Sequence, residues 1–177
     1  LGRIHGSADL ETAIASLQSA GMDSFNIDLM FGLPGQEEAG ALADIGMAIQ
    51  SGAAHLSHYQ LTLEPNTAFF ARPPTLPDDE SAWRMQASTA NKLTQHGFRQ
   101  YEISAWALPG NECRHNLNYW RYGDFLGIGA GAHSKLSNAA DNSIRRLSKN
   151  RHPRKYLAGD YVATNRCIND PEKTFEF

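Results

Sequence analysis

This chain has few cysteines, no long apolar run and no strong excess of charge of either sign. Its 177 residues include only two cysteines, Cys113 and Cys167, which form no Cys-x-x-Cys pair. A disulfide-rich secreted scaffold, a four-cysteine zinc site and a three-cysteine iron–sulfur loop are therefore excluded within this sequence. The scarcity of cysteine favours a reducing, cytoplasmic location.

Two further absences limit the class of protein. All apolar runs are much shorter than the ~18 residues that a membrane-spanning helix needs, so we expect no integral membrane segment. A formal net charge of −3 argues against a general nucleic-acid binder. The sequence starts at Leu1, without an initiator Met or the apolar core of a signal peptide, and we expect it to be a fragment of a longer protein.

Helix and strand signals alternate through the first hundred residues. The apolar periodicity and the turn residues predict three helices, over 7–20, 37–50 and 78–96. They also predict three strands, over 25–31, 54–63 and 98–106. This alternation predicts an α/β fold built from βαβ units around a parallel sheet. Three parallel strands cannot close a barrel and would leave an edge unprotected, so the pattern indicates consecutive units of a larger (β/α) barrel.

The regular alternation ends after Leu108. Glycine, asparagine and aromatic residues then dominate until a helix that we expect over 153–159. We therefore expect two parts: residues 1–106 supply the last βα units of a barrel, and residues 107–177 form an irregular α+β accessory segment that leads towards a C-terminal domain.

Polar residues close each predicted strand, where a parallel barrel places its functional groups. Asp28 precedes the Gly32–Gly35 turn, and its carboxylate can either bind a ribose or ammonium group or accept hydrogen bonds from the turn's own amides. The second strand ends with residues that can line the same mouth or simply be exposed: Tyr59, Gln60, Thr62 and Glu64. Tyr101 and Glu102, on the third strand, have the same two interpretations.

Side chains that ligate and stack are concentrated between Cys113 and Tyr122. Cys113 and His115 form a Cys-x-His pair, which is half of a metal site or a structural pair. Haem iron needs only one or two protein ligands, so either residue alone can ligate haem. Tyr119 and Trp120 can stack on a porphyrin or pack in a core.

Two later segments carry weaker signals. Gly127–Gly131 lacks the complete Gly-x-Gly-x-x-Gly pattern, and a close approach of backbone to a ligand or neighbouring strand explains its glycines better than a nucleotide loop does. A basic run between Ser143 and Gly159 is expected to be mainly a solvated surface, with some members able to pair with carboxylates such as porphyrin propionates. Its members are Arg145, Arg146, Lys149, Arg151, Arg154 and Lys155.

Four motifs occur in a recognisable order. They are LGRIH at 1–5, NIDLMFGLPG at 26–35, YQLTLEPNT at 59–67 and CRHNLNYW at 113–120. Together they resemble the radical SAM family of oxygen-independent coproporphyrinogen III oxidase-like proteins, and His-Asn-x-x-Tyr-Trp resembles its HemW-type haem chaperone branch. The resemblance implies the C-terminal part of a partial (β/α)6 radical SAM barrel. It also implies S-adenosylmethionine (SAM) and a 4Fe–4S cluster, whose Cys-x3-Cys-x2-Cys ligands would lie outside this chain.

The resemblance assigns four residues to SAM. Arg3 is expected at the SAM carboxylate, and Asp28 near the ribose or amino group. The resemblance therefore favours the ligand-binding interpretation of Asp28 over the structural one. Thr62 stands where the oxidase has an alanine beside the adenine, so only a local contact is expected there. His133 lies in the Gly-x-Gly segment that is expected to approach SAM from the C-terminal side.

The resemblance also implies a haem contact and a function. His115, with Cys113 as a second candidate, is expected to contact haem. The parent protein is expected to bind haem and pass it to an unknown acceptor protein. The alternative is SAM-dependent oxidative decarboxylation of coproporphyrinogen III to protoporphyrinogen IX. The chain itself has no cluster ligands, so we expect no radical chemistry from it alone.

Overall fold

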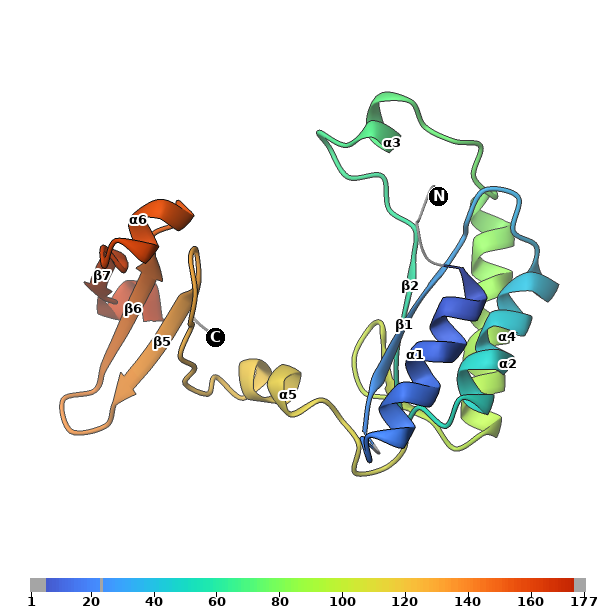
Figure 1. Cartoon of the computed structure of the whole chain (residues 1–177), viewed down its shortest axis with the longest axis horizontal. Helices are drawn as coiled ribbons and strands as arrows, with labels where there is room; N and C mark the ends of the chain where they lie inside the picture. Colours follow the sequence, from blue (N-terminus) through green and yellow to red (C-terminus); the bar gives the residue numbers. More distant parts are fainter. Residues whose placement is uncertain (1–5, 23, 174–177) are drawn as a thin grey trace. The chain divides into compact units, whose positions relative to one another are not determined.

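A computed structural model describes residues 6–22 and 24–173, which form two compact units (Figure 1). The first unit ends at Glu112 and the second begins at Cys113. Each unit has a sheet of its own, with four strands in the first and three in the second. No helix in the described part of the chain is long and apolar enough to cross a membrane.

The first unit contains the βαβ arrangement that the sequence predicts. Strands β1 (Asn26–Phe31) and β2 (His55–Gln60) are parallel, and α2 (Glu38–Gln50) connects them. Their register pairs Asn26 with His55 and Phe31 with Gln60. The predicted strands over 25–31 and 54–63 and the helix between them are therefore confirmed.

The predicted third parallel strand is wrong. In place of that strand the chain forms a hairpin of β3 (Arg99–Gln100) and β4 (Ala105–Ala107), and β4 pairs antiparallel with β2. The sheet order is β1-β2-β4-β3. The carboxylate of Glu102 accepts hydrogen bonds from both the backbone N–H and the hydroxyl of Ser104, at 3.1 and 3.0 Å. This local turn reverses the chain in the middle of the segment predicted as one strand.

Helices α1 (Ser7–Ser19), α2 and α4 (Asp79–Gln95) lie along one side of β1 and β2 (Figure 1). Asp78 caps α4 by accepting a hydrogen bond from the Ser81 N–H at 2.7 Å, as its position before the helix predicts. The short α3 (Ala68–Ala71) lies in the connection before α4. Burial of apolar side chains between these helices and the sheet forms the main core: Ile27, Ile45, Ala48, Ala53, Leu56, Leu93, Phe98 and Trp106.

The second unit is built on an antiparallel sheet that the sequence reading missed. Its strands are β5 (His133–Asn138), β6 (Ser143–Lys149) and β7 (Val162–Cys167), paired in that order. Every residue of β7 is exposed, so the strand has no alternation of apolar and polar residues that would reveal it. The helices of this unit are α5 (Arg114–Trp120), α6 (Pro153–Leu157) and α7 (Asp170–Lys173), and α6 confirms the helix expected over 153–159.

Candidate functional site

The face of the β1–β2 pair that points away from the helices carries polar side chains. Successive residues of a strand point to opposite faces, so the buried Ile27 and Phe31 face the helices, whereas Asn26 and Asp28 face the other way and are exposed. Asp28 lies beside Ser57 in the neighbouring strand. We call Asn26, Asp28, His55, Ser57 and Tyr101 the polar network.

Hydrogen bonds link the members of the polar network in a chain. Asn26 Nδ2 donates to Asp28 Oδ1 at 2.6 Å. The other end of the same amide, Asn26 Oδ1, lies 2.6 Å from His55 Nδ1 and accepts from Ser57 Oγ at 3.1 Å. His55 Nε2 lies 2.5 Å from the hydroxyl of Tyr101. The chain therefore starts at a phenol and ends at an exposed carboxylate.

His55 is buried, with 7% of the residue's surface exposed. Burial lowers the pKa of His55, although the negative charges of Asp28 and Glu112 act in the opposite direction. Near neutral pH the ring is therefore uncharged and carries one N–H. Because Asn26 Oδ1 can only accept, that N–H is on Nδ1, and Nε2 accepts from the Tyr101 hydroxyl.

The structure gives the following positions for the residues expected at SAM. Asp28 is exposed on the helix-free face of β1. Thr62 is exposed two residues beyond the end of β2, and its hydroxyl donates a long 3.4 Å hydrogen bond to the Gln60 carbonyl. His133 is the first residue of β5 in the second unit and is exposed. Arg3 lies outside the described residues.

The segment Gly127–Gly131 packs against the start of β5. A Cβ at Gly127 would overlap the backbone carbonyl of His133, and the Gly127 N–H donates to Ser134 Oγ at 2.9 Å. The Gly129 N–H donates to the Tyr156 hydroxyl at 3.1 Å. The expected close approach of backbone to a neighbouring strand is therefore confirmed at Gly127.

The residues expected to contact haem lie at the start of α5. Cys113 is its half-buried N-cap residue, and His115 is exposed in the first turn. The rings of His115 and Tyr119 meet edge to face with centroids 4.7 Å apart, and Tyr119 lies at the same distance from Phe125. Tyr119 and Trp120 remain 42% and 43% exposed, so neither aromatic ring is fully packed in a core.

The basic run is distributed over β6, α6 and the turn between them. Arg146 stacks on Phe125, with the guanidinium carbon 5.7 Å from the ring centroid. The buried cation of this unit, however, is Lys135, which was not singled out from the sequence. Its ammonium donates to the Tyr122 carbonyl at 2.6 Å and lies 5.7 Å from the Tyr122 ring centroid.

Sequence reasoning also missed Asn26 and His55, although a signal for them was present. In both strands polar and apolar residues alternate, as in His55-Leu56-Ser57, which is the pattern of a sheet with one polar face. Tyr101, expected on a third parallel strand, lies between β3 and β4 and contacts His55 edge to face at 5.5 Å between centroids. The carboxylate of Glu102 stabilises the β3–β4 turn by accepting a hydrogen bond from the Ser104 N–H.

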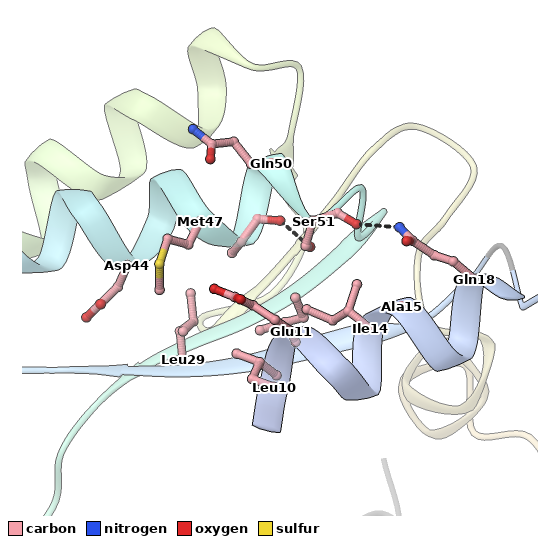
Figure 2. A pocket seen from close by; sticks show the side chains of 12 residues that line it. Leu10, Glu11, Ile14, Ala15, Gln18, Leu29, Asp44, Met47, Gln50 and Ser51 are labelled. Atoms are coloured by element: carbon pink, nitrogen blue, oxygen red, sulfur yellow. Dashed lines mark hydrogen bonds between the residues drawn. The ribbon is translucent and has the colours of Figure 1, made fainter. Parts of the chain in front are cut away.

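A cavity of about 360 Å³ lies between α1, α2 and β1 (Figure 2). Its walls are mainly apolar, with Glu11 and Asp44 at its edge, and Gln18 closes one end by donating to the Ser51 carbonyl at 3.0 Å. Because Leu29 lines it, the cavity lies on the helix-covered side of β1, opposite to Asp28. It is therefore separate from the polar network.

Metal ligands do not converge anywhere in residues 6–22 and 24–173. No group of three or more His, Cys, Asp or Glu side chains in this part of the chain could hold a metal ion.

Several known proteins to which this chain is similar in sequence share one name. The chain is 49% identical over 177 residues to "Heme chaperone HemW" of Escherichia coli K12, and the match covers 100% of this chain and 47% of that protein. The corresponding protein of Haemophilus influenzae is 47% identical over 100% of this chain and 46% of its own length. That of Bacillus subtilis is 38% identical over 140 residues, 77% of this chain and 37% of its own length. No family model matches.

One solved structure has the same fold. The match to the coproporphyrinogen III oxidase HemN of Escherichia coli, described as a radical SAM enzyme, has a TM-score of 0.74 at 16% sequence identity. It covers 98% of this chain and 43% of the oxidase. The mixed α/β fold is therefore that of a part of this enzyme. The chain spans about half the length of the curated relatives it matches.

Proposed function

This chain is homologous to the haem chaperones HemW, relatives of the radical SAM coproporphyrinogen III oxidases, and on that premise we propose that it forms part of a haem-binding chaperone that transfers haem to an acceptor protein. The observation that carries this proposal is the 49% identity that extends over all 177 residues, including the His115–Trp120 motif segment. The cytoplasm is the compartment that the scarcity of cysteine favours.

The haem contact is proposed at the start of α5. The imidazole of His115 is exposed, and Tyr119 and Trp120 beside it keep close to half of their surfaces accessible. An accessible imidazole next to partly exposed aromatic rings suits a flat apolar macrocycle with an iron centre. Cys113, the N-cap residue of the same helix, is the second candidate ligand.

The SAM contact is proposed on the first unit, with Asp28 as its central residue. An exposed carboxylate on a helix-free strand face can accept hydrogen bonds from a ribose or an ammonium group. Arg3 and Thr62 are the further proposed contacts of this unit, and His133, which lies in the second unit, is proposed as a separate SAM contact. When bound, SAM and a 4Fe–4S cluster supply reductive radical chemistry, and we propose that the cluster ligands lie outside these 177 residues.

The architecture fits such a role. We propose that β1 and β2 are two strands of a partial (β/α)6 barrel, because helices cover one face of the pair and polar side chains occupy the other. In barrels of this kind the helix-free face is the inner one. Residues 1–106 would then belong to the barrel, and residues 107–177 to the accessory segment.

A second candidate function is oxygen-independent coproporphyrinogen III oxidase activity, which the structural likeness to HemN favours. The two are separated by incubating the cluster-reconstituted full-length protein anaerobically with coproporphyrinogen III, SAM and a reductant. The chaperone proposal expects haem uptake and no protoporphyrinogen IX. Stoichiometric conversion of the coproporphyrinogen would instead establish the oxidase and reject a pure chaperone.

A further inference from the structure

The side-chain amide of Asn26 has only one orientation that satisfies its neighbours. Its Oδ1 faces two donors, Ser57 Oγ and His55 Nδ1, and its Nδ2 faces the carboxylate of Asp28. Flipping the amide would set its oxygen against a carboxylate oxygen and its N–H groups against an N–H, so the flipped state is electrostatically disfavoured. The amide therefore presents a donor to Asp28 in a fixed direction.

His55 and Tyr101 continue the hydrogen bonding on the oxygen side of that amide. The phenol donates to His55 Nε2, which leaves the ring's single proton on Nδ1, directed at Asn26. Burial of His55 keeps the ring uncharged, so it carries a single proton, and the acceptor Asn26 Oδ1 places that proton on Nδ1. The consequence is a hydrogen-bond chain with one direction, running from Tyr101 through His55 and Asn26 to the Asp28 carboxylate.

Asp28 itself is exposed, and an exposed carboxylate on a strand can rotate about its Cβ–Cγ bond. A 2.6 Å hydrogen bond from Asn26 to one carboxylate oxygen restricts this rotation and fixes where the remaining acceptor positions point. Preorganised acceptors bind a ligand more tightly, because the cost of ordering them is removed from the binding step.

We propose that Asn26 is a positioning residue that orients the Asp28 carboxylate for SAM, and that His55 and Tyr101 hold Asn26 in its working orientation. This inference rests on the proposed SAM contact of Asp28 and goes beyond it by assigning three residues that do not touch the ligand. Ser57 contributes a second donor to the same Asn26 oxygen.

The test is a double-mutant cycle on the cluster-reconstituted full-length protein, with the SAM dissociation constant as the measurement. We expect Asn26→Ala and Asp28→Asn each to weaken SAM binding by about tenfold. In the Asp28→Asn background, Asn26→Ala should cause no further loss, because its effect passes through the carboxylate. Tyr101→Phe should weaken binding less than Asn26→Ala and should likewise have no effect once Asp28 is replaced.

Two further variants separate positioning from folding. Asn26→Asp is nearly isosteric and keeps the acceptor for His55 and Ser57, but it replaces the donor to Asp28 with a negative charge, so SAM binding should weaken at least as much as in Asn26→Ala. Asn91→Ala, at an exposed position of α4, should bind SAM like the wild type.

The outcomes distinguish failure of this inference from failure of the proposed function. Wild-type affinity in Asn26→Ala and Asn26→Asp, together with weakened binding in Asp28→Asn, would overturn the positioning role and leave the Asp28 contact intact. Additive losses in the double variant would also overturn it. Wild-type affinity in Asp28→Asn would reject the SAM contact itself, and the positioning role with it.

Discussion

The ring of His58 lies 4.7 Å from the ring of Phe31, between centroids, on the helix-covered side of the sheet. His58 is only 7% exposed, and burial lowers its pKa from 6.5 to about 4. In the polar network, on the opposite face of the same strand, burial also lowers the pKa of His55. The two faces of β2 thus each hold an uncharged histidine, one against an aromatic ring and one in a hydrogen-bond chain.

The buried neutral state of His58 predicts a loss of stability in mild acid. Above pH 6.5 the ring is neutral in both the folded and the unfolded protein, so its contribution is constant there. As the pH falls from 6.5 to about 4, the unfolded chain takes up a proton that the folded protein does not, and the free energy of unfolding should fall by about 3 kcal/mol. Urea unfolding at several pH values measures this slope.

Two histidine variants provide the control for that slope. His58→Gln lacks the titrating ring, so it should have a shallower dependence of unfolding free energy on pH between 6.5 and 4, whatever its absolute stability. His152→Gln, at an exposed position, should keep the wild-type slope. An unchanged slope in His58→Gln would show that other groups cause the acid sensitivity.

Two isoleucines of the first unit should differ sharply in their contribution to stability. Ile45 is completely buried in the core formed by α2 and the sheet, whereas Ile103 is 85% exposed in the β3–β4 turn. Ile45→Ala should lower the free energy of unfolding by about 2–5 kcal/mol, because it removes buried apolar surface and leaves a cavity. Ile103→Ala should change it by less than about 0.5 kcal/mol. Similar losses in both variants would contradict the described core.

Gly127 should not tolerate even a methyl group. Its Cβ position is occupied by the His133 carbonyl, and the chain there is held by two hydrogen bonds of 3.0 Å between the backbones of Phe125 and Lys135. Gly127→Ala should therefore separate the two segments and increase amide hydrogen exchange at Lys135, at a cost of about 1–3 kcal/mol. In the control Gly40→Ala the new methyl makes an ordinary contact, and exchange at Lys135 should not change. Unchanged exchange in Gly127→Ala would refute the close approach.

Local signals in the sequence were sufficient for helices α1, α2, α4 and α6 and for the parallel pair of strands, but not for the short helices α3, α5 and α7. The periodicity of residues 7–20 and the start of the helix predicted over 78–96 each depend on neighbours within one or two turns of helix, and both helices are confirmed. The β3–β4 hairpin was missed because its two strands are very short and the turn between them contains no glycine or proline, so the segment resembles one continuous strand.

The polar network could not be predicted from local sequence, because its contacts depend on register. Asn26 and His55 are 29 residues apart, and His55 and Tyr101 are 46 apart. They meet only because the parallel pairing sets His55 beside Asn26 and the hairpin returns Tyr101 to the same face. The family motif identified Asp28 as a candidate contact but did not identify the role of Asn26, His55 or Tyr101. Their role depends on where the fold places them and not on a distinctive sequence pattern.

His115 should act as a haem ligand if the account of the second unit is correct. In His115→Ala the Soret band of the haem-loaded full-length protein should shift and the affinity for haem should fall by about tenfold or more, since an axial ligand is lost. Cys113→Ala tests the second candidate in the same way, and His152→Ala is the matched exposed histidine. A His115→Ala variant with the wild-type spectrum and affinity would remove His115 as a ligand.

The central claim is that the protein to which this chain belongs binds haem, and haem titration of the full-length protein, followed through the Soret band, tests it most directly. The account predicts saturable binding with a spectrum distinct from that of free haem. A titration that shows only the spectrum of free haem, with no saturation at any protein concentration, would contradict it.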